Sequence, residues 1–191
     1  MWDPYGGVLW LAGVPLALWL VRRGRHEDFW HLIFVSGAIA AGYGVLQYFQ
    51  VELIWSKVLN PYGNRSVSTF GNPNFISSYL VMLVPMVAAY FLQARTAFQR
   101  LFYGGIFFLY EAFLLCSLTR SSWGGAVCGL AALAMFREYR AKIAENRKLF
   151  IFISCFALLM ALFWPGSSLL KDYRPSVIER IGELSNVDIS R

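Results

Sequence analysis

The chain alternates between long runs of apolar residues and short charged links, and this block pattern limits the folds that are open to it. Of its 191 residues 58% are hydrophobic, and they gather in runs instead of recurring at the spacing of an amphipathic helix. A helix rises about 1.5 Å per residue, so these runs can cross most of a roughly 30 Å hydrocarbon layer. The pattern predicts an all-α, polytopic membrane protein.

Six runs predict a bundle of about six transmembrane helices within residues 1–164. The predicted spans are residues 5–21, 29–49, 75–91, 101–118, 119–136 and 149–164. The fifth apolar run begins only at Trp123, so the helix must take residues 119–122 into its first turn to be long enough, which draws Arg120 to the interface or below it. Residues 165–191 are predicted to begin an external loop with a short amphipathic helix, because a capping box precedes apolar residues at helical spacing.

The positive charges predict the orientation of this bundle. Ten of the seventeen Lys and Arg residues fall in three short links, at residues 22–28, 92–100 and 137–148, so the positive-inside rule places these links in the cytoplasm. Both chain ends are then expected outside. A net charge of +6 confined to such links serves topology, and we expect no nucleic-acid partner.

Residues 65–75 form a polar link directly before the third span. Asn72 and Pro73 indicate a helix start, because Asn caps free amides and Pro at the first helical position loses no needed N–H. Arg65 and Asn74 are thereby placed where a membrane helix meets water. Two interpretations stay open: a capped helix with an arginine snorkelling to lipid headgroups, or a polar pocket at the membrane surface.

A few polar or reactive side chains fall inside or beside the apolar runs. Glu111 lies deep in the fourth span, and we expect it to face the bundle and to be protonated, paired or next to a wet cavity. His26 and His31 are expected at the interface without a catalytic role. The cysteines do not predict a disulfide framework or a metal site, because they are odd in number and lie in apolar runs; they are Cys116, Cys128 and Cys155.

Small residues recur four apart in two of the predicted helices. The pairs are Gly37 with Ala41, Ala40 with Gly44, and Gly125 with Gly129. This spacing lets helix backbones approach closely, so we expect these faces to pack against neighbouring helices.

Three motifs together resemble the O-antigen ligase and Wzy-type polysaccharide polymerase family. They are residues 44–49 (GVLQYF), residues 65–74 (RSVSTFGNPN) leading into 79–85, and residues 117–123 (SLTRSSW). The resemblance runs along nearly all of the chain and depends on the order and spacing of the motifs. It implies a multi-pass protein of the cell inner membrane that takes part in polysaccharide or lipopolysaccharide biosynthesis in the cell envelope.

The resemblance also implies an activity. Family members take a glycan from an undecaprenyl-diphosphate carrier at the outer face of the membrane, and they need neither cofactor nor catalytic metal. Departure of a diphosphate needs positive charge beside it, which arginine supplies through a planar, bidentate fork. The outer-face arginines are Arg65, Arg120, Arg174, Arg180 and Arg191; the substrate-binding candidates are Arg65, Asn72, Asn74, Arg120 and Arg191.

The chain differs from the family in its number of helices and in the absence of a recognisable catalytic loop. Family members have more helices and a large external loop with an essential arginine and histidine, and neither histidine here is expected on the outer face. We therefore expect a fragment whose catalytic residues lie beyond residue 191. An alternative from another class is a membrane transporter or non-catalytic scaffold, which Glu111 within a helix would fit.

Overall fold

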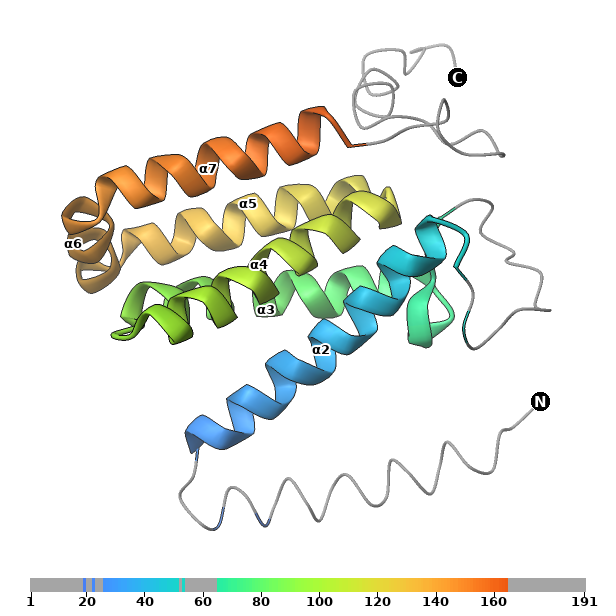
Figure 1. Ribbon diagram of the computed structural model, residues 1–191, viewed down its shortest axis with the longest axis horizontal. Helices are drawn as coiled ribbons and strands as arrows, with labels where there is room; N and C mark the ends of the chain where they lie inside the picture. The colour runs from blue at the N-terminus through green and yellow to red at the C-terminus, as the bar shows by residue number, and fades with distance from the viewer. Residues whose placement is uncertain (1–18, 20–21, 23–25, 52, 54–64, 165–191) are drawn as a thin grey trace, which may run out of the picture. The chain divides into compact units, whose positions relative to one another are not determined.

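A computed structural model describes residues 19, 22, 26–51, 53 and 65–164, with only the backbone described at residues 26–28. Its elements are α2 (His26–Tyr48), the 3-10 helix η1 (Ser68–Phe70), α3 (Pro73–Gln93), α4 (Ala97–Ser117), α5 (Arg120–Met135), α6 (Arg137–Glu145) and α7 (Arg147–Leu162) (Figure 1). No strand occurs among these residues, and the all-α prediction is confirmed for them.

Three helices are long and apolar enough to cross a membrane. They are α3, α4 and the part of α2 from Phe29 to Tyr48. Their composition indicates a membrane protein. Helices α5 and α7 have 16 residues each and are shorter than a usual span. The predicted first span at residues 5–21 and the predicted external loop at 165–191 lie outside the described residues, apart from Trp19.

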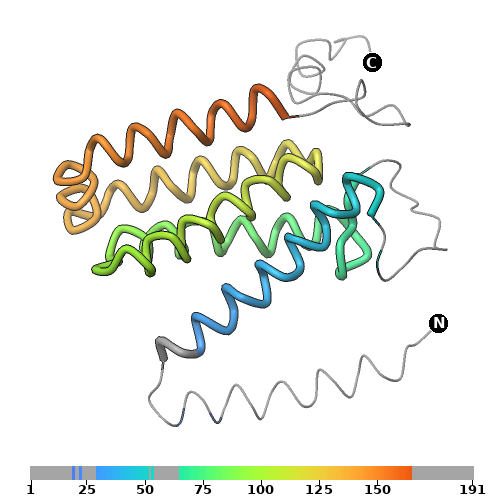
Figure 2. Tube along the Cα trace, in the orientation of Figure 1, coloured from blue at the N-terminus to red at the C-terminus, as the bar shows by residue number. Residues whose placement is uncertain are grey.

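The chain divides into two compact units, residues 1–36 and 37–191. Within the second unit, α3 packs against both α4 and α5, and α7 packs against α4 (Figures 1 and 2). The largest fully buried side chains in this unit come from α2, α3 and α4, and include Tyr48, Ile76, Leu80, Tyr110 and Phe113. None of the residues of α7 is buried, so the core lies around α3 and α4.

Local sequence explains where α3 and α4 begin and end. The Asn72 side chain accepts a hydrogen bond from the Asn74 amide at 2.8 Å, and Pro73 is the first residue of α3, as the sequence predicted. At α4, Thr96 and Gln99 form a reciprocal capping box. Leu118 ends α4 in the left-handed conformation with φ 52°, and only Leu118 and Thr119 separate α4 from α5.

Close helix packing at the small residues is confirmed within the second unit. A Cβ atom added at Gly125 would lie 3.0 Å from Val81 of α3, and one added at Gly129 would lie 3.2 Å from Pro85. On α2, a Cβ at Gly37 would lie 2.5 Å from the Tyr110 hydroxyl of α4. A side chain at these positions would crowd side chains of the neighbouring helix, so the glycines allow the helices to pack closely.

The basic link at residues 137–148 is largely helical, because most of it is the nine-residue helix α6, which was not predicted from the sequence. Its sequence, REYRAKIAE, consists largely of good helix formers. Tyr139 and Ile143, four residues apart, are half-buried on one side. The Tyr139 hydroxyl accepts a hydrogen bond from Gln93 Nε2 of α3 at 3.0 Å, so tertiary contacts also hold this helix.

Candidate functional site

The Arg65 guanidinium joins three segments that are distant in the sequence. Its Nε donates a hydrogen bond to the Ser117 carbonyl oxygen at 2.8 Å. Its Nη2 donates to Asn74 Oδ1 at 2.8 Å and to Thr119 Oγ1 at 2.7 Å. The segment before α3, the first turn of α3 and the α4–α5 link therefore meet at one half-buried cation. We call Arg65, Asn74, Ser117 and Thr119 the Arg65 cluster.

The acceptors of the cluster follow from where the helices end and begin. Ser117 is the last residue of α4, so its carbonyl has no partner in a following helical turn and is available to Arg65. Thr119 is buried, and its hydroxyl lies 3.4 Å from the hydroxyl of Ser77. Ser77 in turn donates to the Pro73 carbonyl at 2.5 Å. The hydroxyl groups of Thr119 and Ser77 therefore form the buried side of the cluster.

A second set of hydrogen bonds fixes the segment that carries Arg65. Ser66 Oγ donates to the Gly44 carbonyl, and the Ser68 amide donates to Gln47 Oε1 at 2.7 Å. Ser68 Oγ donates to the Ala40 carbonyl at 2.5 Å. Ser66, Ser68 and Gln47 are all buried. The chain just after Arg65 is therefore tied to the C-terminal part of α2, which determines where the guanidinium lies.

The structure brings together four of the five substrate-binding candidates. Arg65 and Asn74 are bonded to each other, and Asn72 caps the helix that Asn74 begins. Arg120 is the first residue of α5, is half-buried, and directly follows Thr119 of the cluster. The fifth, Arg191, lies outside the described residues, as do Arg174 and Arg180.

Sequence reasoning missed the hydroxyl and amide groups that hold the site, among them Ser66, Ser68, Ser77, Thr119 and Gln47. The available signal was weak: small polar residues inside or next to apolar runs. For Arg65, sequence reasoning considered only snorkelling to lipid headgroups or a place in a polar pocket, and not hydrogen bonds that hold the protein together. The Nε and Nη2 groups of Arg65 are bonded within the protein, so its first role in the structure is to position other groups.

Glu111 lines an apolar cavity of about 390 Å³ between α3, α4, α5 and α7. Its Oε2 atom is buried and has no hydrogen-bond partner among the described residues. The other lining side chain with a polar atom is Trp123, and its Nε1 donates to the Leu114 carbonyl at 2.8 Å. Glu111 therefore faces other helices, as expected, but the described part of the cavity supplies neither a counter-charge nor a polar partner.

Within the described residues no group of three or more His, Cys, Asp or Glu side chains could hold a metal ion. Cys116 is buried, while Cys128 and Cys155 are exposed, and all three are free thiols. The described chemistry is thus that of arginine, amide and hydroxyl groups.

Comparisons with protein-family models, curated proteins and solved structures found no match to this chain. The resemblance to the O-antigen ligase family therefore stays a prediction made from the motifs.

Proposed function

We propose that this chain is part of a membrane glycan transferase that binds an undecaprenyl-diphosphate-linked glycan through the Arg65 cluster and Arg120. The observation that carries the proposal is the set of three hydrogen bonds from Arg65, which joins the first turn of α3 to the α4–α5 link. Arg120 directly follows that link as the first residue of α5. The family resemblance supplies the reaction class.

The two arginines have different roles in this proposal. Arg65 is a positioning residue, because its Nε and Nη2 already bind Ser117, Asn74 and Thr119. Arg120 is the cation that contacts the diphosphate. It stands at the start of α5, where Thr119 makes no side-chain capping bond, and the first amides of a helix add partial positive charge.

The proposal includes a topology of six spans with both ends outside in the cell inner membrane. Helices α2, α3 and α4 are long enough alone. For α5 and α7, with 16 residues each, flanking residues complete the crossing. The basic links at 22–28, 92–100 and 137–148 then lie in the cytoplasm, and the Arg65 cluster lies at the outer face.

The proposal is tested by measuring how undecaprenyl diphosphate binds the purified chain in detergent micelles, with undecaprenol as the phosphate-free control. Arg120→Ala should weaken binding by about 1.5–3 kcal/mol, the worth of a hydrogen bond to a charged group. Arg120→Lys should recover only part of it, because lysine lacks the bidentate fork. Arg95→Ala, which removes an exposed arginine at the other end of α3, is the matched control.

Arg65→Lys should weaken binding and also lower the unfolding temperature, since one ammonium cannot reproduce the three bonds of Arg65. If both Arg120 variants bind the diphosphate as the unchanged chain does, the proposal is wrong.

A second candidate is a transporter, favoured by the unpartnered carboxylate of Glu111 inside its cavity. Buried acids in membrane helices commonly serve proton or ion paths. Proteoliposomes with an imposed pH gradient separate the candidates: proton flux that Glu111→Gln abolishes would favour transport, and the transferase proposal expects no such flux.

A further inference from the structure

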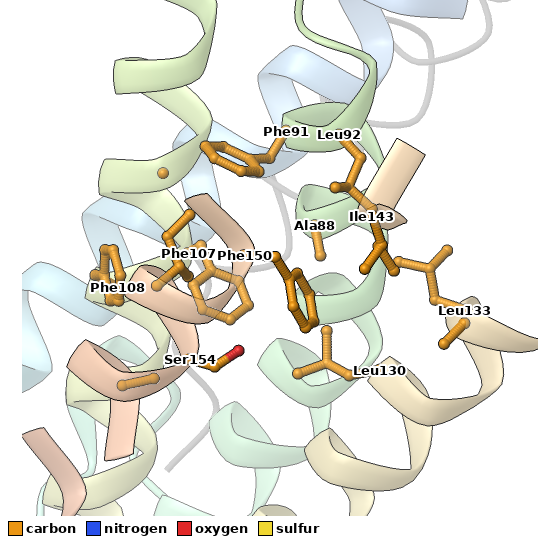
Figure 3. Close-up of a pocket in the computed structure, with 14 residues that line it drawn as sticks. Ala88, Phe91, Leu92, Phe107, Phe108, Leu130, Leu133, Ile143, Phe150 and Ser154 are labelled. Atoms are coloured by element: carbon orange, nitrogen blue, oxygen red, sulfur yellow. The ribbon is translucent and has the colours of Figure 1, made fainter. Parts of the chain in front are cut away.

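A separate apolar pocket of about 260 Å³ lies at the opposite end of α3 from the Arg65 cluster. Side chains from five helices, α3 to α7, turn toward it, as Figure 3 shows. Only one lining side chain, Ser154, is polar. The pocket is not sealed, because Phe150, one of its walls, is 42% exposed. Its volume is below the roughly 300–1,000 Å³ of sites for whole drug-sized ligands, so it suits a stretch of hydrocarbon chain.

Basic residues border this pocket at the α6–α7 corner. Residues 137–148 contain five basic side chains against two acidic ones: Arg137, Arg140, Lys142, Arg147 and Lys148 against Glu138 and Glu145. Arg140, Arg147 and Lys148 are exposed. The corner therefore combines an apolar recess with a surplus of positive charge.

Helix periodicity places two of these cations beside the pocket. Arg147 precedes the lining residues Phe150 and Ser154 of α7 by three and seven positions, so all three lie on one face of that helix. Arg140 precedes the lining residue Ile143 of α6 by three positions. Lys148, in contrast, shares its face with Ile151 and Phe152, which do not line the pocket and are 58% and 68% exposed.

We propose that this corner binds one anionic phospholipid, with part of an acyl chain in the apolar pocket and the phosphate between Arg140 and Arg147. A chain segment alone could belong to any lipid, and the basic side chains select a headgroup with net negative charge. Basic clusters next to membrane helices attract anionic lipids, and a pocket between helices converts that attraction into a defined site. The site is independent of the Arg65 cluster and of glycan transfer.

The test measures lipid adducts on the detergent-solubilised full chain by native mass spectrometry, with dioleoylphosphatidylglycerol compared with dioleoylphosphatidylcholine. We expect the anionic lipid to bind about tenfold more tightly or better, the size of one charged hydrogen bond. The double variant Arg140→Gln/Arg147→Gln should abolish that preference. The matched control, Arg95→Gln/Lys148→Gln, removes the same charge from the α3–α4 link and from another face of α7, and should keep the preference.

Filling the pocket tests the acyl chain separately. Ala134→Phe places a ring where the chain would lie, and should lower binding of phosphatidylglycerol by about tenfold or more. Ala131→Phe, on an exposed position of the same helix, should not. Ser154→Leu serves the same purpose if Ala134→Phe does not fold, as judged by helical circular dichroism.

Three outcomes would overturn the site. Equal loss in both double variants would mean a diffuse surface charge, and equal binding of the two lipids would mean that the corner does not select charge. Full binding to folded Ala134→Phe and Ser154→Leu would mean that another occupant, such as a segment of this chain, fills the pocket.

Discussion

At the residue scale, Arg65 is characterised by the groups that it binds. Arg65 binds a backbone carbonyl, an amide oxygen and a hydroxyl, each within 2.7–2.8 Å. A guanidinium has five N–H donors in a fixed plane, so these bonds also fix its orientation. Arg120 follows the last of these acceptors by one residue. A substitution at Arg65 is therefore expected to disturb the position of Arg120 as well.

At Glu111, an apolar substitution is predicted to raise the stability of the fold. Its buried Oε2 has no described partner, and a buried polar group without a partner costs about 1–3 kcal/mol of stability. Glu111→Leu should therefore unfold at a higher temperature than Glu111→Gln, which keeps a polar group in the apolar lining. The measurement is thermal unfolding of both variants in detergent.

The same pair of substitutions at the exposed Glu138 provides the control, where no such difference is expected. A leucine variant at position 111 less stable than the glutamine variant would show that a polar partner of Glu111 exists outside the described residues.

Individual contacts of this kind could be predicted only in part. The helix start at Asn72 and Pro73 was readable because a cap is a local motif. The acceptors of Arg65 were not, since Ser117 and Thr119 lie 52 and 54 residues away, and a free backbone carbonyl has no signature in sequence. The sequence also indicated that Glu111 faces other helices. It did not indicate that the described surroundings of Glu111 are apolar, because these residues come from helices far apart in the sequence.

At the scale of elements, the crossing of α3 and α5 depends on the absence of side chains at two glycines. Gly129→Leu should lower stability by about 1–3 kcal/mol, the usual cost of overpacking, because a Cβ there already lies 3.2 Å from Pro85. Gly124→Leu is the control on the same helix, where a Cβ would meet nothing within 4 Å. Thermal unfolding of both variants checks the difference, and equal stability would contradict the close crossing.

Helix boundaries were predicted well where length and apolarity dominate, as in α3 and α4. The helix α6 was not predicted, because the charges of this link were used only to assign its side of the membrane. Nine residues that are mostly good helix formers, with Tyr139 and Ile143 four apart on one side, are sufficient for a helix once α3 provides a contact through Gln93. Positive charge predicts the side of the membrane and says little about local backbone structure.

At the scale of the whole molecule, the distribution of charge gives a test of the proposed topology. In a chain without its native cysteines, Thr69→Cys should react with a membrane-impermeant maleimide in intact cells. Glu138→Cys should react only after permeabilisation, because α6 belongs to the links predicted in the cytoplasm. Both positions are exposed, so access to the side chain is comparable. Reaction of position 138 alone in intact cells would reverse the orientation.

The long sequence separation within the Arg65 cluster has a consequence for biosynthesis. Chains are made from the N-terminus, so Arg65 and Asn74 leave the ribosome well before Ser117 and Thr119 exist. The α3 cap needs only neighbouring residues and is complete early. The bonds from Arg65 to the α4–α5 link must wait until both α4 and the start of α5 have been delivered to the membrane. The Arg65 cluster is thus completed late, after the helices that carry its members.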